Sequence, residues 1–121
     1  MTDHNPVKLA RMCSVFAAPV RVRIVTLLRN GPLCVGALSA RLAVTQGAVS
    51  QHLRILREAG VVVADKRGNF VHYRLNIEVL RAWGEAMGRF WQATKPANGS
   101  TANGKCPGKE QGSCVMKRKS V

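Results

Sequence analysis

Apolar side chains recur every three or four residues along most of the chain, which is the spacing of amphipathic helices. Before residue 61 the pattern predicts four helices, over residues 6–17, 19–29, 33–42 and 45–60. Proline suits the first turn of a helix, so Pro6 and Pro19 mark two of the starts. Asn30-Gly31-Pro32 ends the second helix. Thr45 is a good N-cap for the fourth helix, which ends at Gly60.

The first three helices carry apolar stripes that we expect to face the core. The first stripe comprises Val7, Ala10, Cys13, Phe16 and Ala17. The second comprises Val20, Ile24, Leu27 and Leu28. The third comprises Cys34, Leu38 and Leu42.

Two β-prone runs, 61–64 and 70–75, flank the polar, glycine-containing stretch 65–69. This arrangement predicts a β-hairpin. Asn76 can cap a last helix that has one broad apolar side. That side comprises Ile77, Leu80, Trp83, Met87, Phe90 and Trp91.

The predicted order is therefore four helices, a hairpin and a fifth helix. Only Ala43-Val44 joins the third helix to the fourth, as in a helix-turn-helix, and a basic hairpin follows directly. This succession predicts a mainly α fold with a small β-hairpin wing, the winged helix-turn-helix.

Charge indicates the partner of this fold. The 121 residues hold 19 Lys and Arg against 6 Asp and Glu, a formal net charge of +13, and 46% of the residues are hydrophobic. This composition allows one domain with a real core and suggests a polyanionic partner. A membrane is disfavoured because no run of about 18 uncharged apolar residues exists. No leader segment opens the chain, so we expect a cytoplasmic protein.

Composition changes sharply at Lys95-Pro96. Residues 1–94 carry a net charge of +8, and residues 95–121 carry +5 without apolar periodicity. We therefore expect a folded domain over 6–94 and a flexible, basic, cysteine-containing tail over 95–121.

The fourth helix carries the argument for DNA. On a helical wheel its inner side comprises Ala48, Val49, Leu53, Ile55, Leu56 and Ala59. Its outer side comprises Gln46, Ser50, Gln51, Arg54, Arg57 and Glu58. Gln pairs with adenine edges and Arg with guanine edges. The positive helix N-terminus at Thr45 and Gln46 suits a phosphate. An ordinary solvated face has the same polarity, and the net charge and the basic hairpin favour DNA over it.

Basic residues of the hairpin extend this surface. Lys66 and Arg67 at its tip and Arg74 on its return strand can track phosphates or enter a minor groove, although a charged tip can also serve solubility alone. His52 lies at the edge of the inner face, where a packed or capping imidazole is favoured over a metal ligand. No two His residues are four apart, so a helical zinc site is not expected.

The segment "LCVGALSARLAVTQGAVSQHLRILREAGVV" resembles the ArsR/SmtB family of metal-responsive bacterial repressors, and the similarity extends over about residues 6–94. The resemblance implies a homodimer formed through the first and last helices. It implies that the dimer represses its own operon and leaves operator DNA when an inducing metal or metalloid binds. It places the recognition helix at Thr45 to Gly60 and the wing at Val61 to Leu75.

The chain departs from the family's two best-known ligand patterns. The arsenic-binding branch carries Cys-Val-Cys in the third helix, where this chain reads Cys34-Val35-Gly36. The zinc-sensing branch uses Asp and His in the last helix, where this chain has Glu78 and Glu85 but no His. Neither site can form in the family's form.

Four cysteines nevertheless indicate a soft inducer, because thiolates select soft ions. Trivalent arsenic or antimony is favoured, and a soft divalent ion less so; no cofactor is expected for folding. Cys106 and Cys114 lie in a glycine-rich stretch with nearby lysines that favour the thiolate. Cys34 and Cys13 are weaker candidates, since each fits an apolar helix stripe better. The tail thiols could also have no role.

Three rival functions follow from the same residues. The cysteines could sense oxidants or reactive sulfur on the same fold. The charge could serve a nonspecific architectural DNA protein. An enzyme is not expected, because the chain shows no C-x-x-C pair, nucleophile elbow, phosphate loop or paired catalytic acids.

Overall fold

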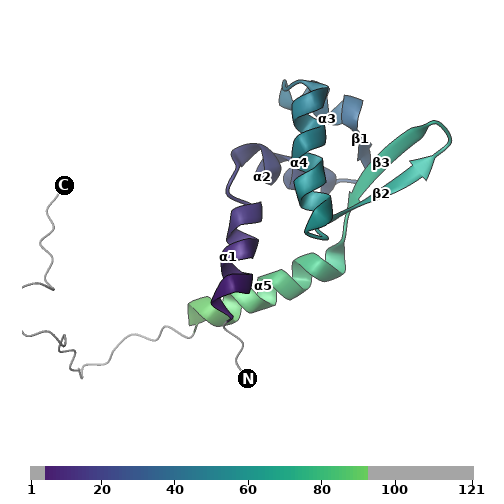
Figure 1. The fold of residues 1–121 in the computed structure, drawn as a ribbon. Helices are drawn as coiled ribbons and strands as arrows, with labels where there is room; N and C mark the ends of the chain where they lie inside the picture. Colours follow the sequence, from purple (N-terminus) through teal and green to yellow (C-terminus); the bar gives the residue numbers. More distant parts are fainter. Residues whose placement is uncertain (1–4, 93–121) are drawn as a thin grey trace, which may run out of the picture.

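A computed structural model describes residues 5–92 of the chain. The structure has five helices and one small sheet, and the β2–β3 hairpin of this sheet projects to one side of the helices (Figure 1). The helices are α1 (Pro6–Val15), α2 (Pro19–Leu28), α3 (Val35–Leu42), α4 (Gln46–Glu58) and α5 (Ile77–Gln92). The strands are β1 (Leu33–Cys34), β2 (Val62–Arg67) and β3 (Phe70–Leu75). The predicted winged helix-turn-helix is therefore confirmed, and the tail predicted at 95–121 lies outside the described residues.

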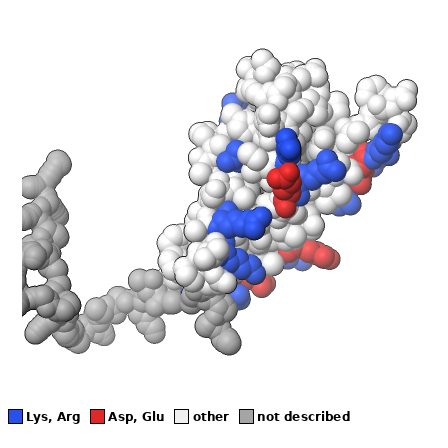
Figure 2. Space-filling model, viewed as in Figure 1, with Lys and Arg blue, Asp and Glu red and all other residues white. Residues whose placement is uncertain are grey.

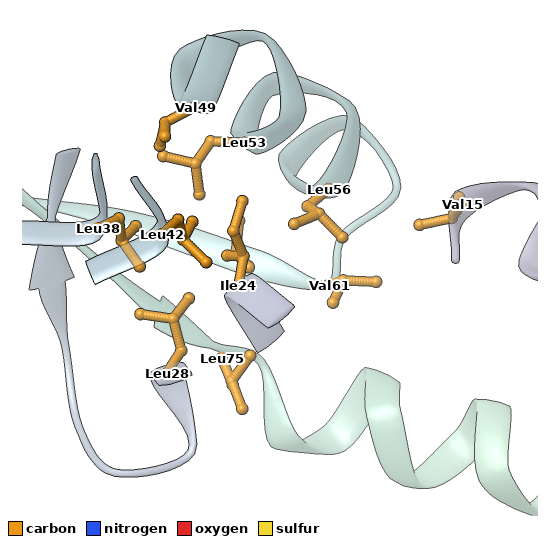
Figure 3. Packing of buried hydrophobic residues seen from close by; sticks show 11 residues of the cluster. Val15, Ile24, Leu28, Leu38, Leu42, Val49, Leu53, Leu56, Val61 and Leu75 are labelled. Carbon is orange, nitrogen blue, oxygen red and sulfur yellow. The ribbon is translucent and has the colours of Figure 1, made fainter. Parts of the chain in front are cut away.

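The core lies between α2, α3, α4 and the sheet (Figure 3). Ile24, Leu38, Val49 and Leu56 are fully buried in it. Burying one such side chain stabilises the fold by roughly 1.5–3 kcal/mol. These contacts fix α4 against α2 and α3, so its outward face has one defined orientation.

The strands form an antiparallel sheet in the order β1-β3-β2. β2 and β3 pair from Val62 opposite Leu75 to Arg67 opposite Phe70, which is longer than the predicted run 61–64. The turn is therefore only Gly68-Asn69, and Gly68 has a φ of +62°. A two-residue hairpin turn with glycine first matches the right-handed twist of the strands.

Strand β1 was not predicted, because two residues are too short to show an alternating pattern. Leu33 pairs with Tyr73 and Cys34 pairs with His72. The prediction of a helix over 33–42 was thus wrong at its start. Cys34 is the N-cap of α3, and its Sγ accepts a hydrogen bond from the backbone N–H of Ala37 at 3.5 Å.

The turn between α3 and α4 is held by local hydrogen bonds. Ala43 adopts a left-handed conformation with φ +56°. The Ser39 hydroxyl donates to the backbone oxygen of Val44, and the backbone N–H of Val44 donates to the oxygen of Ser39 at 3.3 Å. Thr45 then caps α4, as predicted, its Oγ1 accepting from the N–H of Ala48 at 3.1 Å.

Helix α1 packs through a different side from the one predicted. Met12 and Val15 are buried, whereas Val7 is 77% exposed and Cys13 is exposed. The stripe starting at Val7 was misassigned because two apolar rows run along this short helix. The alternative chosen for Cys13, a small buried side chain, is therefore wrong for the single chain.

Helix α5 lies below the rest of the molecule and packs against α1 (Figure 1). Asn76 begins it as predicted, its Oδ1 accepting from the N–H of Val79 at 3.3 Å. No residue of α5 is fully buried, and Ile77, Phe90 and Trp91 of its predicted apolar side are exposed in the single chain. None of the helices described over residues 5–92 is long and apolar enough to cross a membrane.

Candidate nucleic-acid interface

Helix α4 presents the polar face that the sequence predicts. Its buried side comprises Val49, Leu53 and Leu56. The predicted DNA-reading residues on the other side are all exposed, namely Gln46, Ser50, Gln51, Arg54 and Arg57. Ile55 was expected inside but is 39% exposed. The reason is that only Val49, Leu53 and Leu56 of α4 are buried, so the buried side is narrower than the helical wheel predicted.

One acidic residue modifies this face. Glu58 Oε2 lies 3.4 Å from Arg54 Nε, one helical turn away, and both side chains are 69% exposed. Such exposed pairs contribute little to stability. The pair turns the Arg54 guanidinium toward Glu58, which is the last residue of α4.

Helix α4 and the sheet enclose a groove of about 460 Å³. It is lined by Ser50, Leu53, Arg54, Arg57, Glu58 and Tyr73. Tyr73 belongs to β3, so the recognition helix and the wing share one concave surface. That surface brings together residues that stand about twenty positions apart in the sequence.

The wing extends the surface with positive charge. Lys66 and Arg67 are exposed at the end of β2. Arg74 Nε donates to Asp65 Oδ2 at 2.6 Å, so Arg74 is engaged across the hairpin and neutralises the acid of β2. Lys and Arg side chains form a broken band across the face in Figure 2, from α1 over α4 to the hairpin.

His52 is a hydrogen-bonding partner, consistent with the packed or capping role predicted for it. Its Nδ1 lies 3.1 Å from Nη1 of Arg21, which comes from α2. Sequence reasoning missed Arg21, because a wheel of α2 places it outside the apolar stripe, with the solvated arginines. Only the contacts of Arg21 in the folded chain distinguish it from the other arginines of α2.

The described thiols do not form a metal site. Cys13 is exposed on α1 and Cys34 is half-buried at the N-cap of α3. Within residues 5–92, no group of three or more His, Cys, Asp or Glu side chains is arranged to hold a metal ion. Cys106 and Cys114, the favoured pair, lie outside the described residues.

A second surface feature lies between α1 and α5. A groove of about 350 Å³ is lined by Met12, Cys13, Phe16, Leu80, Trp83, Gly84, Met87 and Trp91, and its walls are almost entirely apolar. Phe16 and Trp83 meet edge to face there, with ring centroids 6.0 Å apart. Trp91 remains 62% exposed.

Helix α4 packs on α2 and α3, and the paired strands β2 and β3 lie beside it. This arrangement defines a winged helix-turn-helix of the DNA-binding regulatory class. Residues 18–63 match the family model described as "Bacterial regulatory protein, arsR family". The chain is 41% identical to a chain solved as a possible transcriptional regulator for arsenical resistance, with a TM-score of 0.60. That match covers 64% of this chain and 81% of the other. This protein belongs to the ArsR family.

Curated relatives point the same way. The chain is 43% identical over 68 residues to the transcriptional regulator NmtR of Mycobacterium tuberculosis, covering 56% of this chain and 57% of NmtR. It is 42% identical over 72 residues to the arsenic resistance transcriptional regulator ArsR1 of Pseudomonas putida, covering 59% and 56%. The matches thus span little more than half the length of these relatives, which are named as regulators and not as enzymes.

Proposed function

We propose that the protein is a metal(loid)-responsive transcriptional repressor that binds operator DNA as a homodimer. One observation carries the proposal: α4 turns a row of exposed amide, hydroxyl and guanidinium groups outward beside a basic wing, over a shared groove. A helix of this kind fits the major groove while a wing reaches the flanking backbone. Membership of the ArsR family supports this role.

The exposed residues of this surface divide into two roles. Gln51 and Arg54 on α4 read base edges, because amide and guanidinium groups match adenine and guanine edges. Thr45 and Gln46 at the helix N-terminus, with Ser50 and Arg57, contact phosphate or base edges beside them. Lys66, Arg67 and Arg74 of the wing bind the phosphate backbone, so they set affinity and salt dependence.

The apolar groove between α1 and α5 supports the homodimer. Trp91, Met87 and Leu80 present apolar surface that the single chain leaves open to water. Large apolar patches rimmed by polar residues typically mark protein interfaces. A second copy placed on this groove would cover it and set two recognition helices at a fixed separation for two half-sites.

A soft inducer is the finer part of the proposal. Thiolates prefer soft ions such as trivalent arsenic or antimony, and two of the compared regulators carry arsenic resistance in their names. Because the described residues complete no site, the proposed ligands are Cys106 and Cys114, with Cys34, Cys13 or a thiol of a second copy completing the set. A soft divalent ion is the weaker inducer candidate.

The competing proposal is a thiol-based sensor of oxidants or reactive sulfur on the same fold. The exposure of Cys13 in the single chain favours it, since a thiol that lines the proposed dimer groove can react without unfolding while the two chains are apart. The two proposals differ in what releases DNA. A metalloid acts under full reduction, whereas peroxide or persulfide acts only by changing the oxidation state of sulfur.

The deciding experiment begins by selecting the tightest duplex from a randomised library with the full-length protein. Fluorescence anisotropy then follows release of that duplex by arsenite, antimonite, cadmium, peroxide and persulfide. We expect arsenite or antimonite to release it under reducing conditions. Release by peroxide or persulfide alone supports the redox sensor. Equal affinity for selected and scrambled duplexes would point to the architectural DNA protein and refute the repressor.

The same assay tests the thiol assignment. We expect the double variant Cys106→Ser/Cys114→Ser to bind the duplex as wild type but to lose release by arsenite. Cys34→Ser and Cys13→Ser, made separately, identify any third ligand. If the double variant still releases DNA at the wild-type arsenite concentration, the tail pair is not the inducer site.

A further inference from the structure

Arg21 of α2 uses all three of its guanidinium nitrogens on two other helices. Its Nε donates to the backbone oxygen of Val15 at 2.6 Å, and its Nη2 donates to the oxygen of Ser14 at 3.3 Å. Its Nη1 lies 3.1 Å from Nδ1 of His52. One side chain therefore bridges the end of α1 and the middle of α4.

At α1, the guanidinium completes the helix end. The last carbonyls of a helix lack partners within the helix and carry partial negative charge. The last turn of α1 has no basic residue of its own. Arg21 supplies a donor to the oxygen of Val15, a second donor to the oxygen of Ser14 and the positive charge from α2, so it holds this turn of α1 at a set distance from the helix-turn-helix.

At α4, the contact defines the state of His52. Arginine carries donors only, so Nδ1 of His52 must accept, and the ring proton then sits on Nε2. His52 is half-buried and lies directly after Gln51 and two residues before Arg54. Any shift of His52 along or around α4 therefore displaces the two side chains proposed to read bases.

Few other contacts tie α1 to the DNA-reading part of the chain. Val15 enters the core, and Phe16 packs edge to face on Trp83 of α5. Helix α1 also contacts α5, on the side of the proposed dimer groove. The Arg21 bridge is thus a polar connection between the helices proposed for dimerisation and the helix proposed for recognition.

We infer that Arg21 is a positioning residue for DNA recognition, which fixes the orientation of α4 relative to α1 through His52. The inference rests on the proposed function, because α4 is the helix that meets DNA there. In a dimer built on α1 and α5, this bridge sets the spacing of the two recognition helices. Without it, binding of the selected duplex weakens while nonspecific binding persists.

The first test uses variants that keep charge. Arg21→Lys retains the positive charge and most of the stem but cannot present a planar fork to three acceptors. His52→Leu removes the acceptor. We expect each to lower affinity for the selected duplex about tenfold, with affinity for a scrambled duplex unchanged. The double variant should lose no more than either single variant, because both remove the same bridge.

Two controls separate positioning from general damage. His52→Asn places an acceptor oxygen near the position of Nδ1, so it should restore most of the wild-type affinity. Arg23→Lys makes the same chemical change at an exposed position of α2 and should have no effect. Additive losses in the double variant, an equal loss for both duplexes, or no loss at all would overturn the inference.

A second measurement does not depend on DNA. Hydrogen exchange of the full chain reports the backbone N–H groups of Phe16 and Ala17, which donate to the oxygens of Cys13 and Ser14. In Arg21→Lys we expect these amides to lose protection while the amides of Leu53 and Leu56 in α4 keep theirs. Unchanged protection at Phe16 and Ala17 would refute the bridge even if the proposed DNA-binding function failed.

Discussion

At the scale of single residues, the proposed interface separates groups that choose sequence from groups that supply affinity. Arg54 projects from the middle of the exposed face of α4, whereas Lys66 lies on the wing. Base-edge contacts discriminate between sequences, and phosphate contacts do not. The two residues carry the same charge, so they differ chiefly in where the fold holds them.

Replacing Arg54 and Lys66 separately distinguishes these roles. Arg54→Ala should cost about 1–3 kcal/mol on the selected duplex and relax sequence choice at one position. Lys66→Ala should weaken binding to all duplexes alike and reduce the slope of log K against log salt by about one. Anisotropy titrations over a salt series measure both. Arg29, which is exposed at the end of α2, provides an alanine control. Identical behaviour of the Arg54 and Lys66 variants would contradict the division.

At the scale of elements, the α3–α4 turn contains a backbone conformation that the sequence pattern did not predict. Ala43 takes a left-handed conformation that costs an L-residue roughly 1–2 kcal/mol. The Ser39–Val44 hydrogen bonds and the burial of Leu42 at the end of α3 outweigh this cost. Because the tight turn determines how α3 leads into α4, it also sets the direction of the recognition helix.

Glycine at this turn should therefore relieve strain. We expect Ala43→Gly to raise the free energy of unfolding by up to about 1 kcal/mol, since glycine adopts this conformation without penalty but loses more entropy on folding. Ala40→Gly, at an exposed position inside α3, should instead lower it by about 1 kcal/mol. Urea unfolding followed by circular dichroism measures both. A loss of stability in Ala43→Gly would show that the turn is not strained.

Sequence patterns predicted the elements whose own residues carry the signal. Thr45, Asn76 and the two N-terminal prolines marked helix starts correctly, because caps act within one turn. The patterns failed for β1, which exists only by pairing with β3, and for the buried side of α1, which depends on where α5 packs. Likewise, the exposed polar row of α4 was visible in the sequence, whereas the groove with Tyr73 and the Arg21–His52 contact required the fold.

At the scale of the whole molecule, the described chain has a side that we propose to face DNA and an apolar side. The positive band runs from α1 over α4 to the hairpin (Figure 2). The apolar groove lies between α1 and α5, and these two helices meet at the end of the fold away from the hairpin tip (Figure 1). The core that joins them is continuous through Val15, Ile24 and Leu75. A dimer formed on the groove would leave both recognition helices accessible.

A charge placed in the groove should separate the chains. Trp91 is largely exposed, so Trp91→Glu should leave the fold of a single chain intact but weaken dimerisation at least tenfold, an effect of about 1.4 kcal/mol. Analytical ultracentrifugation measures the dimer constant directly. Ile77→Glu, an exposed apolar position on the same helix but outside this groove, is the matched control. Equal dimer constants for wild type and Trp91→Glu would place the interface elsewhere.

The groove has one practical consequence. Both tryptophans of the chain, Trp83 and Trp91, line it, and the helix-turn-helix and wing contain none. Intrinsic fluorescence is therefore a label-free reporter confined to the α1–α5 end. A change in tryptophan emission on adding a duplex would show that DNA binding at the recognition helix changes the environment of the α1–α5 groove.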